Sequence, residues 1–158
     1  VAAGATSGKV GITGQTATVI YDDLVDLVHA VDPAYRKGKC GFMMHDSSLK
    51  IVRKLKDSAG RPIFLPGYDG LGIAMPDTLL GYPITINQDI ATMAANAKSI
   101  LFGDFSKYVI RDVMGAQMFR FDDSAFISKG QIGFLGWMRA GGNLTDTAAV
   151  KYYQNSAT

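Results

Sequence analysis

The chain has 158 residues, of which 47% are hydrophobic and 19% are charged, and its formal net charge is +2. A chain of this size and composition can bury a sizeable core, so it is neither disordered nor larger than one domain with an appendage. The small net charge gives no argument for binding nucleic acid or an acidic membrane, and the single Cys40 excludes an intramolecular disulfide.

Residues 1–16 are small and rich in glycine, which predicts a poorly packed lead-in before a main domain at residues 17–125. The run from Gly4 to Lys9 approaches a phosphate-binding loop. It has three residues between its glycines instead of four, and Val10 replaces the metal-binding hydroxyl residue, so flexible chain is favoured. The chain starts at Val1 without an initiator methionine, which indicates a fragment or a processed product.

Two helices are predicted in the first half of the chain. One is expected from an N-cap at Asp22 to Asp32, which precedes a proline, and a strand is expected just before it at Thr16–Tyr21. Its apolar stripe consists of Leu24, Leu27, Val28 and Val31. The other is expected from a polar N-cap cluster at residues 46–48 to Gly60, with a basic exposed face. Between them, Cys40–Met44 predicts a buried strand.

The segment Arg61–Met75 is rich in proline and glycine and predicts a long loop, a length typical of functional loops. Its apolar residues favour packing against another molecule. The candidate subunit interface therefore consists of Arg61, Phe64, Tyr68 and Leu71. A small-molecule site of an enzyme in this loop is an alternative.

The second half of the chain reads as strands separated by corners. The expected strands are Ile84–Ile86, Ser99–Phe102, Tyr108–Val113, Gln117–Phe121, Gln131–Arg139 and Ala148–Tyr153. The corner residues are Gly81, Pro83, Gly103 and Asp104. The third and fourth strands are expected to pair across Met114–Gly115, and the fifth, which is apolar on both faces, to lie between two layers.

No arrangement of residues typical of catalysis is found. The two histidines, His29 and His45, lie in unrelated contexts, and Cys40 is five residues from His45 on one expected strand, so the two would face opposite sides. A single cysteine excludes the usual zinc spacings. We therefore predict no catalytic residues, no metal and no cofactor.

Two stretches carry a resemblance to a known family. Residues 79–83 read Leu-Leu-Gly-Tyr-Pro, and residues 101–108 read Leu-Phe-Gly-Asp-Phe-Ser-Lys-Tyr. Together they resemble the major capsid proteins of tailed bacteriophages, which share the Hong Kong 97 fold. The likeness continues upstream at residues 55–61 and downstream at residues 131–139.

The resemblance implies an α+β fold: a central mixed sheet flanked by two helices forms the axial domain, and the C-terminal strands at residues 126–158 return to the peripheral domain. The family's N-terminal arm, extended loop and spine helix normally precede this region, and we expect them to be absent from this chain. The implied function is a structural shell subunit, not an enzyme.

The resemblance also implies partners. The subunit would assemble with copies of itself into pentamers and hexamers in the bacterial cytoplasm, ending in the virion. Scaffold, protease or portal proteins would assist, packaged DNA would be contacted only non-specifically, and no membrane would be involved. An encapsulin-like compartment shell remains an alternative. Some members cross-link their shells through Lys and Asn with a Glu as base; this chain has no Glu, so we predict shells without covalent cross-links.

Overall fold

The computed structural model describes residues 4–57, 59–63, 78–121 and 124–158, with only the backbone at Met114 and Ala125. The strands are β1 (Thr6–Val10), β2 (Cys40–Met44), β3 (Thr78–Leu79), β4 (Tyr82–Ile86), β5 (Lys98–Asp104), β6 (Tyr108–Phe121), β7 (Gly133–Leu144) and β8 (Val150–Gln154). The helices are α1 (Tyr21–His29), α2 (Pro33–Arg36), α3 (Asp46–Arg53), α4 (Ser124–Ile127) and the 3-10 turn η1 (Phe105–Lys107).

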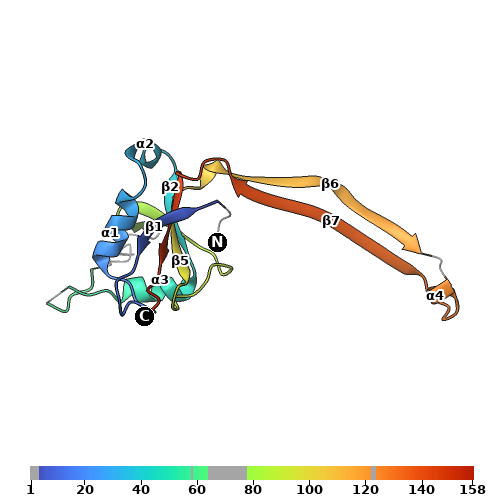
Figure 1. Cartoon of the computed structure of the whole chain (residues 1–158), viewed down its shortest axis with the longest axis horizontal. Helices are drawn as coiled ribbons and strands as arrows, with labels where there is room; N and C mark the ends of the chain where they lie inside the picture. The colour runs from blue at the N-terminus through green and yellow to red at the C-terminus, as the bar shows by residue number, and fades with distance from the viewer. Residues whose placement is uncertain (1–3, 58, 64–77, 122–123) are drawn as a thin grey trace, which may run out of the picture.

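The described residues form two regions of different shape (Figure 1). Six strands make a mixed sheet in the order β1-β8-β5-β2-β4-β3, and with α1, α2 and α3 they form what we call the body. Strands β6 and β7 pair only with each other and project from the body; we call this pair the ribbon. The predicted α+β class with a mixed sheet and flanking helices is confirmed.

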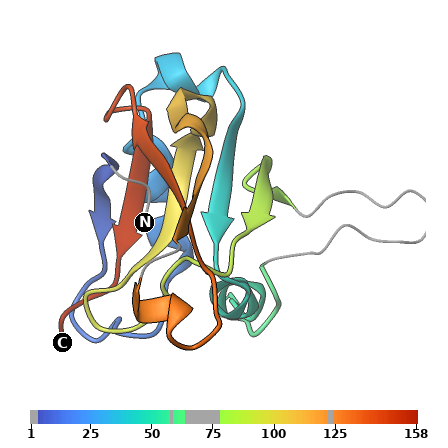
Figure 2. The same ribbon diagram turned by 90° about the vertical axis from the view of Figure 1, so that its right-hand side faces the viewer.

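Two helices cover one face of the sheet of the body. Leu24 of α1 and Val52 of α3 belong to one buried cluster with Phe42 and Phe102, which lie opposite each other on β2 and β5. The opposite face is covered by a smaller cluster that includes Leu101, the sequence neighbour of Phe102. Adjacent strand residues point to opposite faces, so both faces of β5 are buried. Figure 2 shows the strands of the body side by side, with the ribbon directed toward the viewer.

Helix α1 keeps its predicted apolar stripe, but its ends differ from those expected. Its N-cap is Ile20 instead of Asp22, and the backbone N–H of Ile20 donates to the carboxylate of Asp23 at 3.5 Å. The helix ends at His29, not at Asp32. Asp32 instead caps α2, where its side chain accepts from the N–H of Ala34 at 2.7 Å.

Helix α3 is shorter than predicted. Its N-cap is His45, whose Nδ1 accepts from the N–H of Ser47 at 3.0 Å, so the polar residues 46–48 lie inside the helix. It ends at Arg53 instead of Gly60. The predicted strand Cys40–Met44 is confirmed with its bounds, and the runs around Ser99–Phe102 and Ala148–Tyr153 are confirmed as parts of β5 and β8.

The N-terminal residues pack more closely than expected. Thr6–Val10 forms β1, an edge strand parallel to β8, so the prediction of a poorly packed lead-in is wrong for these residues. Gly8 permits the close approach, because a Cβ there would lie 2.8 Å from Cδ1 of Leu27 on α1. The strand expected at Thr16–Tyr21 is also wrong, since residues 16–20 have no regular secondary structure.

Two predictions about the strands of the ribbon are wrong. Tyr108–Val113 and Gln117–Phe121 do not pair across Met114–Gly115, but continue as one strand, β6, and both pair with β7. Gly115, at φ +67°, lies in an irregularity of β6 instead of a reversal. The prediction that residues 131–139 lie between two layers is also wrong, because β7 has exposed apolar residues on both of its faces.

No helix in the described part of the chain is long and apolar enough to span a membrane.

Candidate subunit interface

The ribbon exposes large apolar side chains along most of its length. Met118 is 75% exposed, Phe134 66% and Trp137 41%, and ten further large apolar side chains of the ribbon and its α4 tip are also exposed. Monomeric proteins rarely expose contiguous apolar surface of this extent, and such surface marks a contact with another chain or another part of the same chain.

The register of β6 and β7 assigns the side chains to two faces. Phe119 lies opposite Leu135, and Gln117 lies opposite Trp137. Because directly opposed residues share a face and successive residues alternate, the odd-numbered residues form one face and the even-numbered residues the other. We call these the odd face and the even face. The exposed apolar residues of the even face are Ile110, Met118, Phe134 and Met138.

The root of the ribbon is held against the body by several polar contacts. The carboxylate of Asp104 accepts from the N–H of Ser106 at 3.0 Å, which caps η1 at the corner between β5 and β6. Thr145 donates to the carbonyl of Lys107 both from its N–H, at 3.0 Å, and from its hydroxyl, at 2.9 Å. The two strands of the ribbon are therefore tied together where they leave the body.

A further hydrogen bond links this root to α2. The hydroxyl of Tyr35 donates to Oδ2 of Asp146, on the turn between β7 and β8. This hydrogen bond is the main cause of two pKa shifts: it raises the pKa of Tyr35 and lowers the pKa of Asp146. The ribbon is thus fastened at its base, and its direction relative to the body is set by the fold.

Gly103 lies at the closest backbone approach of this corner. Its φ is +150°, and a Cβ there would lie 2.1 Å from the carbonyl oxygen of Ala149. Only glycine fits, because every other side chain would overlap the backbone of the neighbouring strand. The other predicted corner, Leu80–Gly81, is a two-residue hairpin turn between β3 and β4, with φ of +52° and +81°. Pro83 follows within β4, opposite Thr78 of β3.

The predicted interface loop is only partly within the described residues. Phe64, Tyr68 and Leu71 lie outside them. Arg61 is described, and its Nε lies 3.3 Å from Oδ2 of Asp57 on an exposed turn.

Sequence reasoning missed the interface of the ribbon. Its apolar residues were read as core, since a strand that is apolar on both faces usually lies between two layers of its own domain. The sequence did not give the length of these strands, because Gly115 divided the expected run. In the structure β6 and β7 have 14 and 12 residues, whereas the described strands of the body have at most 7.

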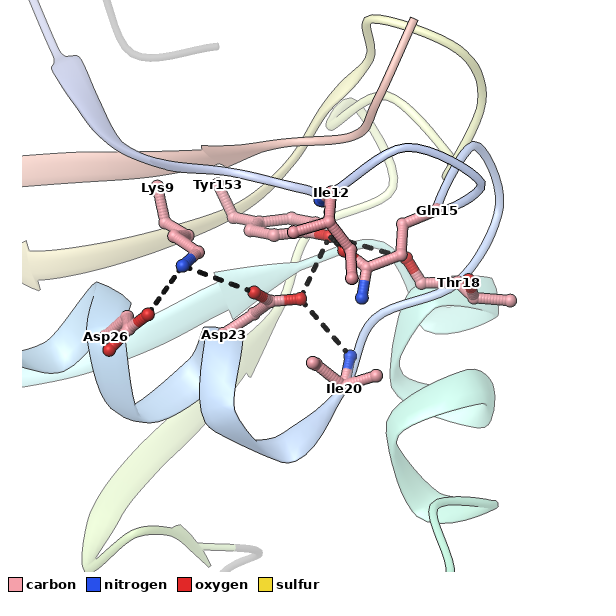
Figure 3. Close-up of polar contacts among 8 residues, drawn as sticks. All are labelled: Lys9, Ile12, Gln15, Thr18, Ile20, Asp23, Asp26 and Tyr153. Carbon is pink, nitrogen blue, oxygen red and sulfur yellow. Dashed lines mark hydrogen bonds and ion pairs between the residues drawn. The ribbon is translucent and has the colours of Figure 1, made fainter. Parts of the chain in front are cut away.

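A buried polar cluster joins the N-terminal segment to the body (Figure 3). The hydroxyl of Tyr153, on β8, has two side-chain acceptors within reach of its single proton: Oε1 of Gln15 at 3.2 Å and Oδ2 of Asp23 at 3.5 Å. Lys9 of β1 lies 2.6 Å from the carboxylate of Asp26 and 3.7 Å from that of Asp23. Burial, followed by the charge of Asp23, raises the pKa of Tyr153, so the hydroxyl stays a neutral donor. These contacts have a structural role, because they attach residues 9–20 to the sheet.

Metal-ligating side chains do not gather into a site among the described residues. No group of three or more His, Cys, Asp or Glu side chains that could hold a metal occurs among them. Cys40 is buried, its thiol donates to the carbonyl of Tyr35, and burial raises its pKa, which disfavours the reactive thiolate. His45 is engaged as the cap of α3. The surface features therefore point to binding of other chains.

Comparisons with known proteins agree with this conclusion. The capsid of an empty GTA particle, computed with C5 symmetry, is 35% identical with a TM-score of 0.70 over 92% of this chain and 49% of that chain. The capsid of the native GTA particle is 33% identical with a TM-score of 0.72, over 94% and 48%. A structure from Gordonia phage Cozz shares the fold at 17% identity, with a TM-score of 0.66 over 99% and 51%.

The chain spans about half the length of these structures. No curated protein sequence matches it. The sequence model of the phage capsid family, however, matches residues 1–155, which is nearly the whole chain. Together with the fold, this match shows that the chain belongs to the phage capsid family.

Proposed function

We propose that this chain is part of a structural shell subunit of a tailed phage or prophage, which assembles with copies of itself into a capsid in the virion. The observation that carries the proposal is the ribbon, whose two apolar faces are exposed while its root is fixed to the body. A projecting element of this kind needs covering surfaces on both sides, and a shell supplies them at several contacts at once. The family match supports this function, and it gives no support to an encapsulin-like shell or a small-molecule enzyme.

We further propose that the body corresponds to the axial domain and that the ribbon belongs to the peripheral part of the subunit. These bounds differ from the expected division at residue 125, because β8 of the expected peripheral segment 126–158 lies in the sheet of the body and β6 of the expected axial segment 17–125 lies in the ribbon. The Arg61–Met75 loop would then contact neighbours near the capsomer axis. Introduction of an aspartate at Tyr68 or Leu71 is expected to block assembly of the encoded subunit and to leave its fold intact. Normal shells from these variants would contradict this assignment of the loop.

The proposed shell is held by non-covalent contacts, and its subunit has no enzymatic activity. Boiled and reduced shells are expected to give a single monomer band on a denaturing gel, whereas a ladder of larger species would contradict this expectation. Assembly in the bacterial cytoplasm, help from scaffold, protease or portal proteins, and non-specific contact with packaged DNA belong to the same proposal.

A charge on the ribbon tests the central claim. The encoded subunit with Phe134→Asp is expected to fold and to form no closed particles under the electron microscope, because the aspartate would have to be buried without a partner. Ile12→Asp is the matched control, since Ile12 is similarly exposed, at 59% against 66%, but lies on the body. Closed particles from the Phe134→Asp variant, or absence of particles from the parent subunit, would contradict the proposal.

The 158-residue chain alone is expected to fold and to remain a monomer or a small ring. The body has its own buried core on both faces of the sheet, whereas shell closure needs complementary contacts at several symmetry axes. Light scattering and electron microscopy distinguish these states. Closed particles from this chain alone would contradict the expectation.

A further inference from the structure

The odd face of the ribbon carries two arginines near its root. Arg111 lies opposite Gly141, and Arg139 lies opposite Val113, so the two side chains are diagonal neighbours on the same face. Both are exposed. Asp112, the acidic neighbour of Arg111 in the sequence, lies opposite Ala140 on the even face.

Neither guanidinium has an ion-pair partner in the part of the chain that the structure describes. Among the described residues, the ion pairs join Lys9 to Asp23 and Asp26, and Arg61 to Asp57, and none includes Arg111 or Arg139. Arg139 instead lies over the ring of Trp137, with 5.3 Å between the guanidinium carbon and the ring centroid. Two adjacent like charges without a counter-ion destabilise a strand pair, so the face gains from an anionic partner.

The surroundings of the two arginines suit a peptide better than a small ion. A hollow of about 670 Å³ lies along this part of the ribbon, and its lining includes Val109 and Val113 beside the two arginines. Gly141, opposite Arg111, contributes no side chain, so the hollow stays open there. The site therefore combines cations with apolar surface, and the ring of Trp137 restrains one of the cations before binding.

The body has carboxylates that match this need. Asp22, Asp32 and Asp46 are exposed at the starts of helices on the body, and none of them takes part in an ion pair among the described residues. The ribbon projects away from the body of its own chain (Figure 1), whereas the body of another copy can be brought to it. Unpaired cations on one region and unpaired anions on the other are complementary between copies.

We propose that the Arg111–Arg139 face of the ribbon binds a carboxylate-bearing segment of a second copy of the subunit. Each guanidinium can donate two parallel hydrogen bonds to a carboxylate, while the apolar lining covers the rest of the segment. This inference rests on the proposed function, since it names the chemistry of one contact between shell subunits.

Cross-linking of mixed copies tests the inference. Arg111→Lys and Arg139→Lys keep the charge and introduce an amine, which a carbodiimide joins to a carboxylate only at contact distance. The encoded subunit is prepared in ¹⁵N-labelled and unlabelled forms, mixed before assembly and cross-linked in the particles. Arg120→Lys is the matched control, because Arg120 lies opposite Phe134 on the even face of the same ribbon.

Cross-linked peptides that pair a labelled with an unlabelled copy are expected at positions 111 and 139, at least about tenfold more often than at position 120. Assembly that fails in these two variants but not in the control also supports the inference, because lysine lacks the two-pronged donor. Particles with no cross-link at these positions, or only with links inside one copy, overturn the inference and leave the proposed function standing. A parent subunit that forms no particles overturns both.

A second measurement uses salt. The double variant Arg111→Gln/Arg139→Gln is expected to lower the association constant of the subunit about tenfold or more at low ionic strength, and to approach the parent near 1 M salt. The same loss at low and high salt, or no loss, would overturn the inference.

Discussion

The strand β5 of the body and the strand β7 of the ribbon carry similar residues and have opposite environments. Both strands have large apolar residues at odd and at even positions, yet Ile100, Leu101 and Phe102 are at most 2% exposed, whereas Phe134 and Met138 are more than 60% exposed. The difference lies in what covers them: β5 has clusters on both faces within the chain, and β7 has only β6 beside it. Apolar residues at both odd and even positions of a strand thus indicate that both faces are covered, but they do not indicate whether the same chain or another chain covers them.

The largest expected effect comes from the corner where the two regions meet. Gly103→Ala is expected to destabilise the chain by more than about 5 kcal/mol, because the new Cβ overlaps the carbonyl oxygen of Ala149 and the φ is unfavourable for alanine. Urea unfolding measures the change. Gly136→Ala on the ribbon is the control, since its Cβ would meet no atom within 4 Å. Equal stability of the two variants would show that this corner adapts.

The next largest effect is expected from removing a phenylalanine of the body core, compared with removing one of the ribbon. Phe102→Ala is expected to cost about 3–5 kcal/mol of the free energy of unfolding, because it leaves a cavity between Phe42 and Tyr82. Phe134→Ala is expected to change the stability of the same chain by about 0.5 kcal/mol or less, because the side chain is already in water. Similar losses from both would mean that the ribbon is covered within the chain, which would remove the contrast.

A smaller effect is expected in the polar cluster that ties β1 to the body. Tyr153→Phe is expected to cost about 1 kcal/mol, the typical value for one lost internal hydrogen bond, and to loosen the N-terminal segment first. Hydrogen exchange of residues 6–10 should accelerate more than that of β2 or β6. Uniform acceleration over all strands would contradict a local role of the cluster.

The smallest expected effect is a pH dependence at the root of the ribbon. The folded state lowers the pKa of Asp146 from its ordinary 3.8, so the Tyr35 bond stabilises the fold above that pH and the contribution is lost as the pH falls through the lowered pKa. Tyr35→Phe should therefore lower the melting temperature at pH 7 and converge with the parent as the pH falls below the lowered pKa of Asp146. Tyr21→Phe serves as the control. A pH-independent difference would contradict the role of this bond.

Much of the body could be predicted because its signals are local. The strand Cys40–Met44 is a short apolar run between polar turns, and the stripe of α1 follows the helical period, so neither depends on distant residues. The helix ends were wrong, because the caps come from Ile20 with Asp23 and from His45, which the usual cap preferences do not single out.

The ribbon could not be predicted from periodicity. The hairpin expected at Met114–Gly115 depended on one glycine, and the observed pairing joins residues as distant as Tyr108 and Leu144. The Arg111–Arg139 pair was missed for the same reason, since two residues 28 positions apart become neighbours only through that register. β1 was missed because its glycines were read as flexibility, although Gly8 permits close packing against Leu27.

The pairing of β1 with β8 also has a consequence for synthesis of the chain. β8 lies between β1 and β5, so an interior position of the sheet is filled by a strand that is synthesised after both of its neighbours. Pairing of residues separated by more than 140 positions makes folding slow, because the entropy of closing such a loop is lost before the contact is made. A nascent chain that ends before Val150 leaves the edges of β1 and β5 open. The sheet therefore closes only after β8 has left the ribosome, and until then the exposed edges are open to premature association with other nascent subunits.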